Sequence, residues 1–212
     1  MKRDNINIGI INCEFGNIAS LINAVNFLKF SNEILIEPKN LKDFSHLILP
    51  GVGSFNESSK KLKKTGWSSA IHSFIKDSKP FMGICLGMQL MFEKGTENGD
   101  EEGLKLFPGI CDKFKKIENY SLPHIGFNLV NSSNSKIWKN IPKTSPFYFV
   151  HSYRITKGSM KIFKNTSISE TVYGEKFVSF VEKNKIFGAQ FHPEKSHSVG
   201  LQLLKNFAME IK

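Results

Sequence analysis

Cysteine is scarce in this sequence: Cys13, Cys85 and Cys111 stand at irregular spacing, without a Cys-x-x-Cys pair. An odd number of cysteines in this arrangement fits neither a disulfide framework nor a zinc knuckle, so we expect no metal. Long apolar runs are also missing, since none approaches the ~20 residues of a membrane span. The first residues are mostly polar and lead into a short strand pattern, not into the apolar core of a signal peptide. These absences favour a cytoplasmic protein without a membrane partner.

Internal repeats, low-complexity tracts and long linkers rich in proline or glycine are absent from the sequence as well. A chain of 212 residues is long enough to bury a full hydrophobic core, and its 40% apolar and 23% charged residues are typical of a globular protein. We therefore predict a single domain over residues 1–212.

Acidic residues are the minority among the charged residues: the 19 aspartates and glutamates are outnumbered by 29 lysines and arginines, which gives a net charge of +10. Such an excess can attract nucleic acid. The lysines are spread along the chain, however, and the dense groups are limited to residues 60–64 and 113–116. We interpret the excess as a lysine-rich surface and expect no nucleic-acid partner. A basic face that docks an acidic protein or steers an anionic substrate remains an open alternative.

The first half of the chain alternates short apolar runs with segments of helical periodicity. Apolar runs that suit buried strands occur at residues 6–12, 34–36, 46–49 and 81–84. Helical periodicity covers residues 18–30 and about 58–76, with an interruption near Gly66. This β-α-β alternation predicts a parallel sheet with right-handed crossovers.

The second half contains short strand-like segments separated by turn residues. They lie at residues 110–117, 128–130, 147–150, 161–163, 171–173, 177–181 and 185–190. Such segments indicate antiparallel or mixed strands, and helical periodicity over residues 199–211 closes the chain. The predicted fold class is α/β: an open, mixed but mostly parallel sheet flanked by helices, with antiparallel strands in the second half.

The most informative motif is Gly83-Ile84-Cys85-Leu86-Gly87, which follows the strand at 81–84 and precedes a helix-compatible stretch. A Gly-x-nucleophile-x-Gly pattern at a strand-to-helix turn is a nucleophile elbow, here with cysteine instead of serine. Glycine tolerates the close chain approach on either side, and the N–H groups of the following helix favour a thiolate. A small buried cysteine in a glycine turn is the alternative, because the motif is short.

Two further segments stand at the carboxyl ends of predicted strands, where reactive groups gather in open α/β sheets. Residues 50–55, Pro-Gly-Val-Gly-Ser-Phe, can offer backbone amides to an oxyanion, although a tight turn would also use these glycines. His192 and Glu194 share a face of an extended backbone, so the carboxylate can orient the ring, although such a pair alone also fits a surface turn. Together with Cys85 these segments supply a nucleophile, a base, an orienting carboxylate and an oxyanion loop.

These motifs belong to sequence blocks that resemble class I, triad-type glutamine amidotransferases and, more closely, the glutaminase subunits of imidazole glycerol phosphate synthase. The blocks span nearly the whole chain, at residues 50–55, 83–92, 102–109, 123–128, 149–154 and 190–196. The cysteine and His-Pro-Glu blocks resemble the broad class, whereas the Pro-Gly-Val-Gly, Pro-His-Ile-Gly and Val-His-Ser-Tyr blocks narrow the resemblance to the subunit. The resemblance implies a flavodoxin-like fold and no cofactor.

The resemblance also implies that Cys85 attacks the side-chain amide of L-glutamine, forms a glutamyl thioester and releases ammonia. His192 would deprotonate the thiol and protonate the ammonia, and Glu194 would set the histidine tautomer. The oxyanion would be held by the amide of Leu86 plus one amide from Gly51, Val52 or Gly53. In this family that loop flips on activation, so the resting site would lack a formed oxyanion hole. One missing donor costs on the order of 10²–10³ in rate.

By the same resemblance, the glutamine pocket is lined by Gln89, Glu97, Ser152 and Tyr153. The first two would hold the amino-acid end of the substrate. Ammonia would pass into a (β/α)8-barrel synthase subunit that docks over the site to form a heterodimer. The docking face would contain Asn17, Phe127, Tyr148 and Lys195, each of which is also compatible with ordinary surface.

Three stretches depart from the family's pattern, at residues 12–17, at Ser121-Leu122 and at Phe127, where tryptophan is usual. They touch partner-facing positions, so two destinations for the ammonia remain. One is the synthesis of imidazole glycerol phosphate and aminoimidazole carboxamide ribotide in histidine biosynthesis. The alternative is a paralogue that supplies ammonia for amidating a sugar in surface-glycan biosynthesis. A catalytically silent docking protein is a third hypothesis, against which the intact Cys-His-Glu set argues.

Overall fold

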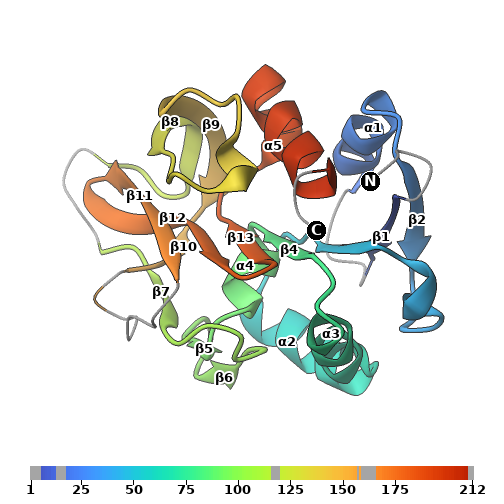
Figure 1. Cartoon of the computed structure of the whole chain (residues 1–212). Coiled ribbons are helices and arrows are strands. Elements are labelled where there is room, and N and C mark those ends of the chain that lie inside the picture. Colours follow the sequence, from blue (N-terminus) through green and yellow to red (C-terminus); the bar gives the residue numbers. More distant parts are fainter. Residues whose placement is uncertain (1–5, 13–17, 116–119, 157, 159–165, 210–212) are drawn as a thin grey trace.

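A seven-stranded sheet forms the centre of the computed structural model, which describes residues 6–12, 18–115, 120–156, 158 and 166–209 (Figure 1). Across the sheet, the strands follow in the order β11 (Ser167–Tyr173), β12 (Glu175–Lys183), β13 (Ile186–Ala189), β4 (Phe81–Ile84), β3 (His46–Leu49), β1 (Asn7–Ile11) and β2 (Ser31–Leu35). The strands from β13 to β2 are parallel, whereas β12 and β11 form an antiparallel edge. The predicted mixed, mostly parallel sheet is therefore present.

Helices cover both faces of this sheet (Figure 1). One face packs against α1 (Ala19–Phe27) and α5 (His197–Met209), and the other against α2 (Phe55–Lys64), α3 (Trp67–Lys76) and the short α4 (Leu86–Leu90). Strands β3 and β4 are buried along their whole length, as is usual for mostly apolar strands in the centre of a parallel sheet. Gly66, with φ +83°, separates α2 from α3 at the predicted interruption. Among the described residues, no helix is long and apolar enough to cross a bilayer.

Two smaller sheets lie toward the antiparallel edge. One is a ribbon of β8 (His124–Asn131) and β9 (Thr144–His151), and the other has the order β10 (Tyr153–Ile155), β7 (Ile110–Lys113), β5 (Lys94–Gly95) and β6 (Glu101–Glu102). The ribbon follows the period of two that a half-buried strand pair requires. Phe147 and Phe149 point into the core, whereas Ile125, Phe127 and Leu129 are exposed.

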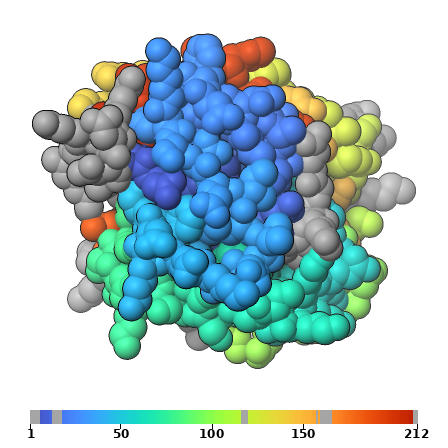
Figure 2. Space-filling view, turned by 90° about the vertical axis from the view of Figure 1, so that its right-hand side faces the viewer, coloured from blue at the N-terminus to red at the C-terminus, as the bar shows by residue number. Residues whose placement is uncertain are grey.

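The opposite end of the large sheet is the edge strand β2, which pairs with β1. Figure 2 shows the molecule from this end, where the N-terminal quarter of the chain covers most of the surface. Ile34 and Ile36 are exposed there, but the strand is short and carries the charged Glu33. Short, charged edges disfavour pairing with another chain.

Most predicted elements are present with shifted ends. β8 begins at His124, four residues before the predicted start at residue 128, because its register with β9 continues past Gly126 to the His124–His151 pair. The two-residue strands β5 and β6 were not predicted, since two residues carry no periodicity. The predicted strand at 161–163 lies outside the described residues.

The elbow between β4 and α4 requires glycine on both sides of Cys85. A Cβ on Gly83 would lie 2.4 Å from the Met91 sulfur and 2.6 Å from the Gly87 carbonyl oxygen, and a Cβ on Gly87 would lie 1.8 Å from the Leu49 carbonyl oxygen. Cys85 itself adopts φ 54° and ψ −111°, which is unfavourable for any residue with a side chain. The close contact of α4 with β3 therefore accompanies a strained backbone at the cysteine.

We expect Gly87→Ala to lower the free energy of unfolding by about 2–3 kcal/mol, because the new methyl group would collide with backbone that cannot move aside as a flexible side chain could. Gly158→Ala is the matched control, since a Cβ at that position meets no atom within 4 Å. Urea denaturation of the full chain measures both values. Equal stability of the two variants would show that the elbow does not depend on this contact.

Candidate active site

Three adjacent parallel strands of the central sheet bring the predicted segments together. β4 lies between β3 and β13, so the chain leaves all three strands at the same edge. Cys85 follows β4, the loop of residues 51–53 follows β3, and His192 with Glu194 follows β13. The strand order therefore gathers residues that are far apart in the sequence, as is usual at the carboxyl edge of such sheets.

Cys85 is fixed at the top of the elbow by its backbone. Its N–H donates a hydrogen bond of 2.7 Å to the carbonyl of Ala189, which ties the elbow to the end of β13. The residue is 5% exposed. Its sulfur lies 3.8 Å from Nε2 of Gln190 and 3.9 Å from the carbonyl oxygen of Val150. The thiol therefore faces polar groups, although it is enclosed by protein.

His192 and Glu194 are hydrogen-bonded as a base and its orienting carboxylate. Nδ1 of the buried His192 ring lies 2.7 Å from Oε1 of Glu194. Because a carboxylate accepts this bond, Nδ1 carries a proton. Nε2 of His192 is buried and has no conventional hydrogen-bond partner among the described residues. The ring thus keeps Nε2 available to exchange a proton.

The surroundings of His192 favour its protonated form. Burial lowers the pKa of the ring, but the sulfur of Cys85 and then the carboxylate of Glu194 outweigh burial and raise the pKa from 6.5 to about 10. An imidazolium beside a thiolate is the arrangement that activates cysteine nucleophiles. The three side chains can therefore work as one unit.

The loop of residues 51–53 faces the elbow with a carbonyl group. The N–H of Leu86, directly after the nucleophile, donates to the Gly51 carbonyl at 3.3 Å. Gly51 is buried against Leu86, whereas Val52 is 44% exposed and Gly53 has φ +109°. The Leu86 amide is therefore occupied in this conformation and is not free to bind an oxyanion.

Gln89 and Tyr153 meet behind the thiol. Nε2 of Gln89 donates at 3.0 Å to the Tyr153 carbonyl and at 3.0 Å to Oε1 of Gln190. Ser152 and Tyr153 are partly buried at the junction of β9 and β10. The structure thus brings Gln89 and Tyr153, two of the four expected glutamine-binding residues, to one wall of the site, and Ser152 directly precedes Tyr153.

Glu97, the fourth of these residues, lies at the start of α2. Its Oε2 accepts the N–H of Phe55 at 2.8 Å and so caps the first turn of the helix that follows the oxyanion loop. Burial and, after it, the charge of Glu97 raise the pKa of Tyr153. Glu97 therefore lies near both the loop and the wall formed by Tyr153.

Three of the predicted partner-facing residues form one cluster on the surface. The rings of Phe127 and Tyr148 lie 5.5 Å apart, and Nζ of Lys195 lies 5.7 Å from the centre of the Tyr148 ring. His197, which was not predicted, stacks on Phe127 with 5.1 Å between ring centres. The remaining residue, Asn17, lies outside the described residues.

Sequence reasoning missed three buried polar residues behind the site. Gln190 is fully buried and points its amide at the Cys85 sulfur. His124 and His151 are hydrogen-bonded to each other across β8 and β9 at 3.1 Å. All three stand in sequence blocks that carried the family resemblance, and this position in the blocks was the available signal.

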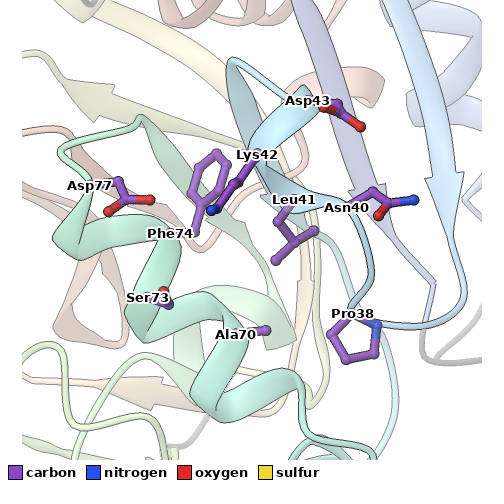
Figure 3. A pocket seen from close by; sticks show the side chains of 9 residues that line it. All are labelled: Pro38, Asn40, Leu41, Lys42, Asp43, Ala70, Ser73, Phe74 and Asp77. Carbon is purple, nitrogen blue, oxygen red and sulfur yellow. The ribbon is translucent and has the colours of Figure 1, made fainter.

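A hollow of about 470 Å³ lies on another part of the surface. Figure 3 shows that its lining side chains come from residues 38–43, from Ala70, Ser73 and Phe74 of α3, and from Asp77 just after this helix. Its charged groups, Lys42, Asp43 and Asp77, are exposed, so water and salt weaken their fields. The hollow contains no thiol, histidine or buried charge among its lining residues, and the site at Cys85 remains the stronger candidate.

The chain has relatives among known proteins. The family model described as glutamine amidotransferase class-I matches residues 11–211. The imidazole glycerol phosphate synthase subunit HisH of Wolinella succinogenes is 40% identical over 205 residues, which cover 94% of this chain and 98% of that protein. The protein of the same name from Caldanaerobacter subterraneus subsp. tengcongensis is 41% identical over 206 residues, with 97% and 98% covered.

The fold has solved counterparts as well. The structure of PurLQS from Thermotoga maritima superimposes with a TM-score of 0.75, covering 98% of this chain and 100% of that chain at 16% sequence identity. At this identity the likeness concerns the fold alone, and it supports the predicted α/β class. Because the family model matches residues 11–211, almost the whole of this chain, the chain belongs to the class I glutamine amidotransferase family.

Proposed function

We propose that the chain is the glutaminase subunit of an imidazole glycerol phosphate synthase and hydrolyses L-glutamine to glutamate and ammonia. The observation that carries the proposal is the convergence of Cys85, His192 and Glu194 at the ends of β4 and β13. The names of the relatives at 40–41% identity support the choice of subunit.

The geometry suits a two-step hydrolysis. The thiolate of Cys85 attacks the δ-carbon of glutamine, and collapse of the adduct breaks the C–N bond while His192 gives its proton to the leaving ammonia. A water molecule, deprotonated by His192, then cleaves the thioester and releases glutamate. Glu194 keeps Nδ1 protonated, so that Nε2 performs both proton transfers.

The resting site would be slow because its oxyanion hole is incomplete. The Leu86 N–H is bonded to the Gly51 carbonyl. Rotation of a peptide in the loop of residues 51–53 would free this N–H and could turn a loop N–H toward the thioester oxygen. Each donor gained would raise the rate on the order of 10²–10³-fold. Docking of a partner with bound substrate is the signal that we propose for this rotation.

The remaining predicted residues fit the same proposal. Gln89, Glu97, Ser152 and Tyr153 would bind the amino-acid end of glutamine. Phe127, Tyr148 and Lys195 would contact a (β/α)8-barrel subunit, which receives the ammonia in the cytoplasm and produces imidazole glycerol phosphate and aminoimidazole carboxamide ribotide. The sugar-amidating alternative gains no support from the names of the relatives described above.

Replacing Cys85 with alanine should abolish product formation from glutamine by the reconstituted complex, because the proposed thioester forms on the Cys85 sulfur. Ammonium salts at alkaline pH should still support synthesis, since the barrel subunit would be intact. Cys111→Ala is the control: Cys111 is also a buried cysteine, in the core, and its loss should leave glutamine use in place. Absence of rescue by ammonia in the Cys85→Ala complex would contradict the proposal.

The Cys85–His192 interaction should also appear in the pH dependence of stability. The folded-state pKa of His192 lies above the unfolded value of ~6.5. Its contribution to the free energy of unfolding is therefore complete below pH 6.5 and is lost as the pH rises to about 10. The stability of the wild type, measured relative to Cys85→Ala, should fall across this interval.

The pKa of His192 can be followed directly by NMR titration of its ring protons. Cys85→Ala should lower it most, because the sulfur contributes more than the carboxylate, and Glu194→Gln should lower it less. An unchanged pKa of His192 in Cys85→Ala would show that the thiol and the ring do not interact.

A further inference from the structure

A chain of hydrogen bonds connects the exposed ribbon to the thiol through two buried histidines. Nδ1 of His124 lies 3.1 Å from Nε2 of His151, and Nδ1 of His151 lies 2.8 Å from the Tyr153 carbonyl oxygen. The same carbonyl accepts the Gln89 amide at 3.0 Å. Gln89 then bonds to Gln190, whose amide faces the Cys85 sulfur.

Which atom donates in each of these hydrogen bonds follows from the Tyr153 carbonyl at one end of the series. The Tyr153 carbonyl can only accept, so Nδ1 of His151 carries the proton. In a neutral ring, Nε2 of His151 is then an acceptor, and Nδ1 of His124 must donate to it. Nε2 of His124 is left as an acceptor, 3.5 Å from Nδ2 of Asn128 on the ribbon. Each ring thus has one tautomer that satisfies its neighbours.

The surroundings keep both rings neutral and closely packed. Burial lowers the pKa of His124 to about 4 and that of His151 to about 3. The His124 ring is stacked between Tyr173 and Phe149, with 4.0 Å and 4.9 Å between ring centres. A buried pair that does not ionise near neutral pH is suited to hold geometry rather than to transfer protons.

We infer that His151, supported by His124, is a positioning residue for glutamine binding. Its Nδ1–H fixes the Tyr153 carbonyl, the carbonyl fixes the Gln89 amide, and Gln89 fixes Gln190 beneath the thiol. This role rests on the proposed function, since it requires that the wall formed by Gln89 and Tyr153 receives glutamine. His124 and His151 would thus influence glutamine binding without touching the reacting atoms.

The test uses the full chain with Cys85→Ala, in which glutamine can bind without turnover, and measures the Kd of L-glutamine by isothermal titration calorimetry. His151→Leu removes the donor to Tyr153 and should weaken binding about tenfold, as expected for one lost hydrogen bond. His151→Asn can place an N–H near the position of Nδ1 and should restore most of the affinity. This rescue separates positioning from a general loss of stability.

His46→Leu is the matched control, because His46 is equally buried, has a pKa lowered to about 4, and packs against Phe207 away from the site. It should lower the melting temperature without changing the Kd of glutamine. An unchanged Kd in His151→Leu, or equal weakening in His151→Asn and His151→Leu, would overturn the inference. If the Cys85→Ala chain itself binds no glutamine, the proposed function fails, and the inference fails with it.

Discussion

The strained backbone at Cys85 is the constraint on which the active site depends. The combination of φ 54° and ψ −111° at Cys85 lies outside the allowed regions for residues with a side chain, and it costs about 1–3 kcal/mol that the surrounding structure must offset. Here the bond to Ala189 and the contact of Gly87 with Leu49 hold the turn between β4 and α4. The same turn lifts the sulfur toward β13 and points the Leu86 amide at the loop after β3.

Two kinds of polar group surround this turn, one charged and one neutral, and they have different roles. His192 and Glu194 form a charged unit with the thiol, and the raised pKa of His192 reflects that coupling. Behind the thiol, neutral carboxamides and histidines satisfy one another in a fixed order. A buried network of this kind stabilises one geometry because each unpaired member would be costly. The charged side chains thus lie where protons are transferred, and neutral groups fix the wall formed by Gln89 and Tyr153.

Local patterns in the sequence were enough to predict a mixed, mostly parallel sheet and to single out Cys85, His192 and Glu194 as candidate catalytic residues. Gly83, Cys85 and Gly87 lie in one short turn, and His192 and Glu194 are two residues apart, so each motif is visible without tertiary information. The Leu86–Gly51 bond could not be derived from the residues, because the same sequence permits either orientation of the loop peptide. The pairing of His124 with His151 depends on the register of β8 and β9, which Gly126 obscures in the sequence.

Covalent trapping tests the central claim, that Cys85 is the residue that attacks glutamine. The full chain, alone and with its barrel partner, would be treated with a glutamine analogue that carries an alkylating carbon at the δ position, and the modified peptide would be identified by mass spectrometry. The account predicts modification of Cys85, protection by excess glutamine and slower labelling in His192→Asn. Labelling of Cys13 or Cys111 in place of Cys85, or an unmodified Cys85 in the assembled complex, would contradict it.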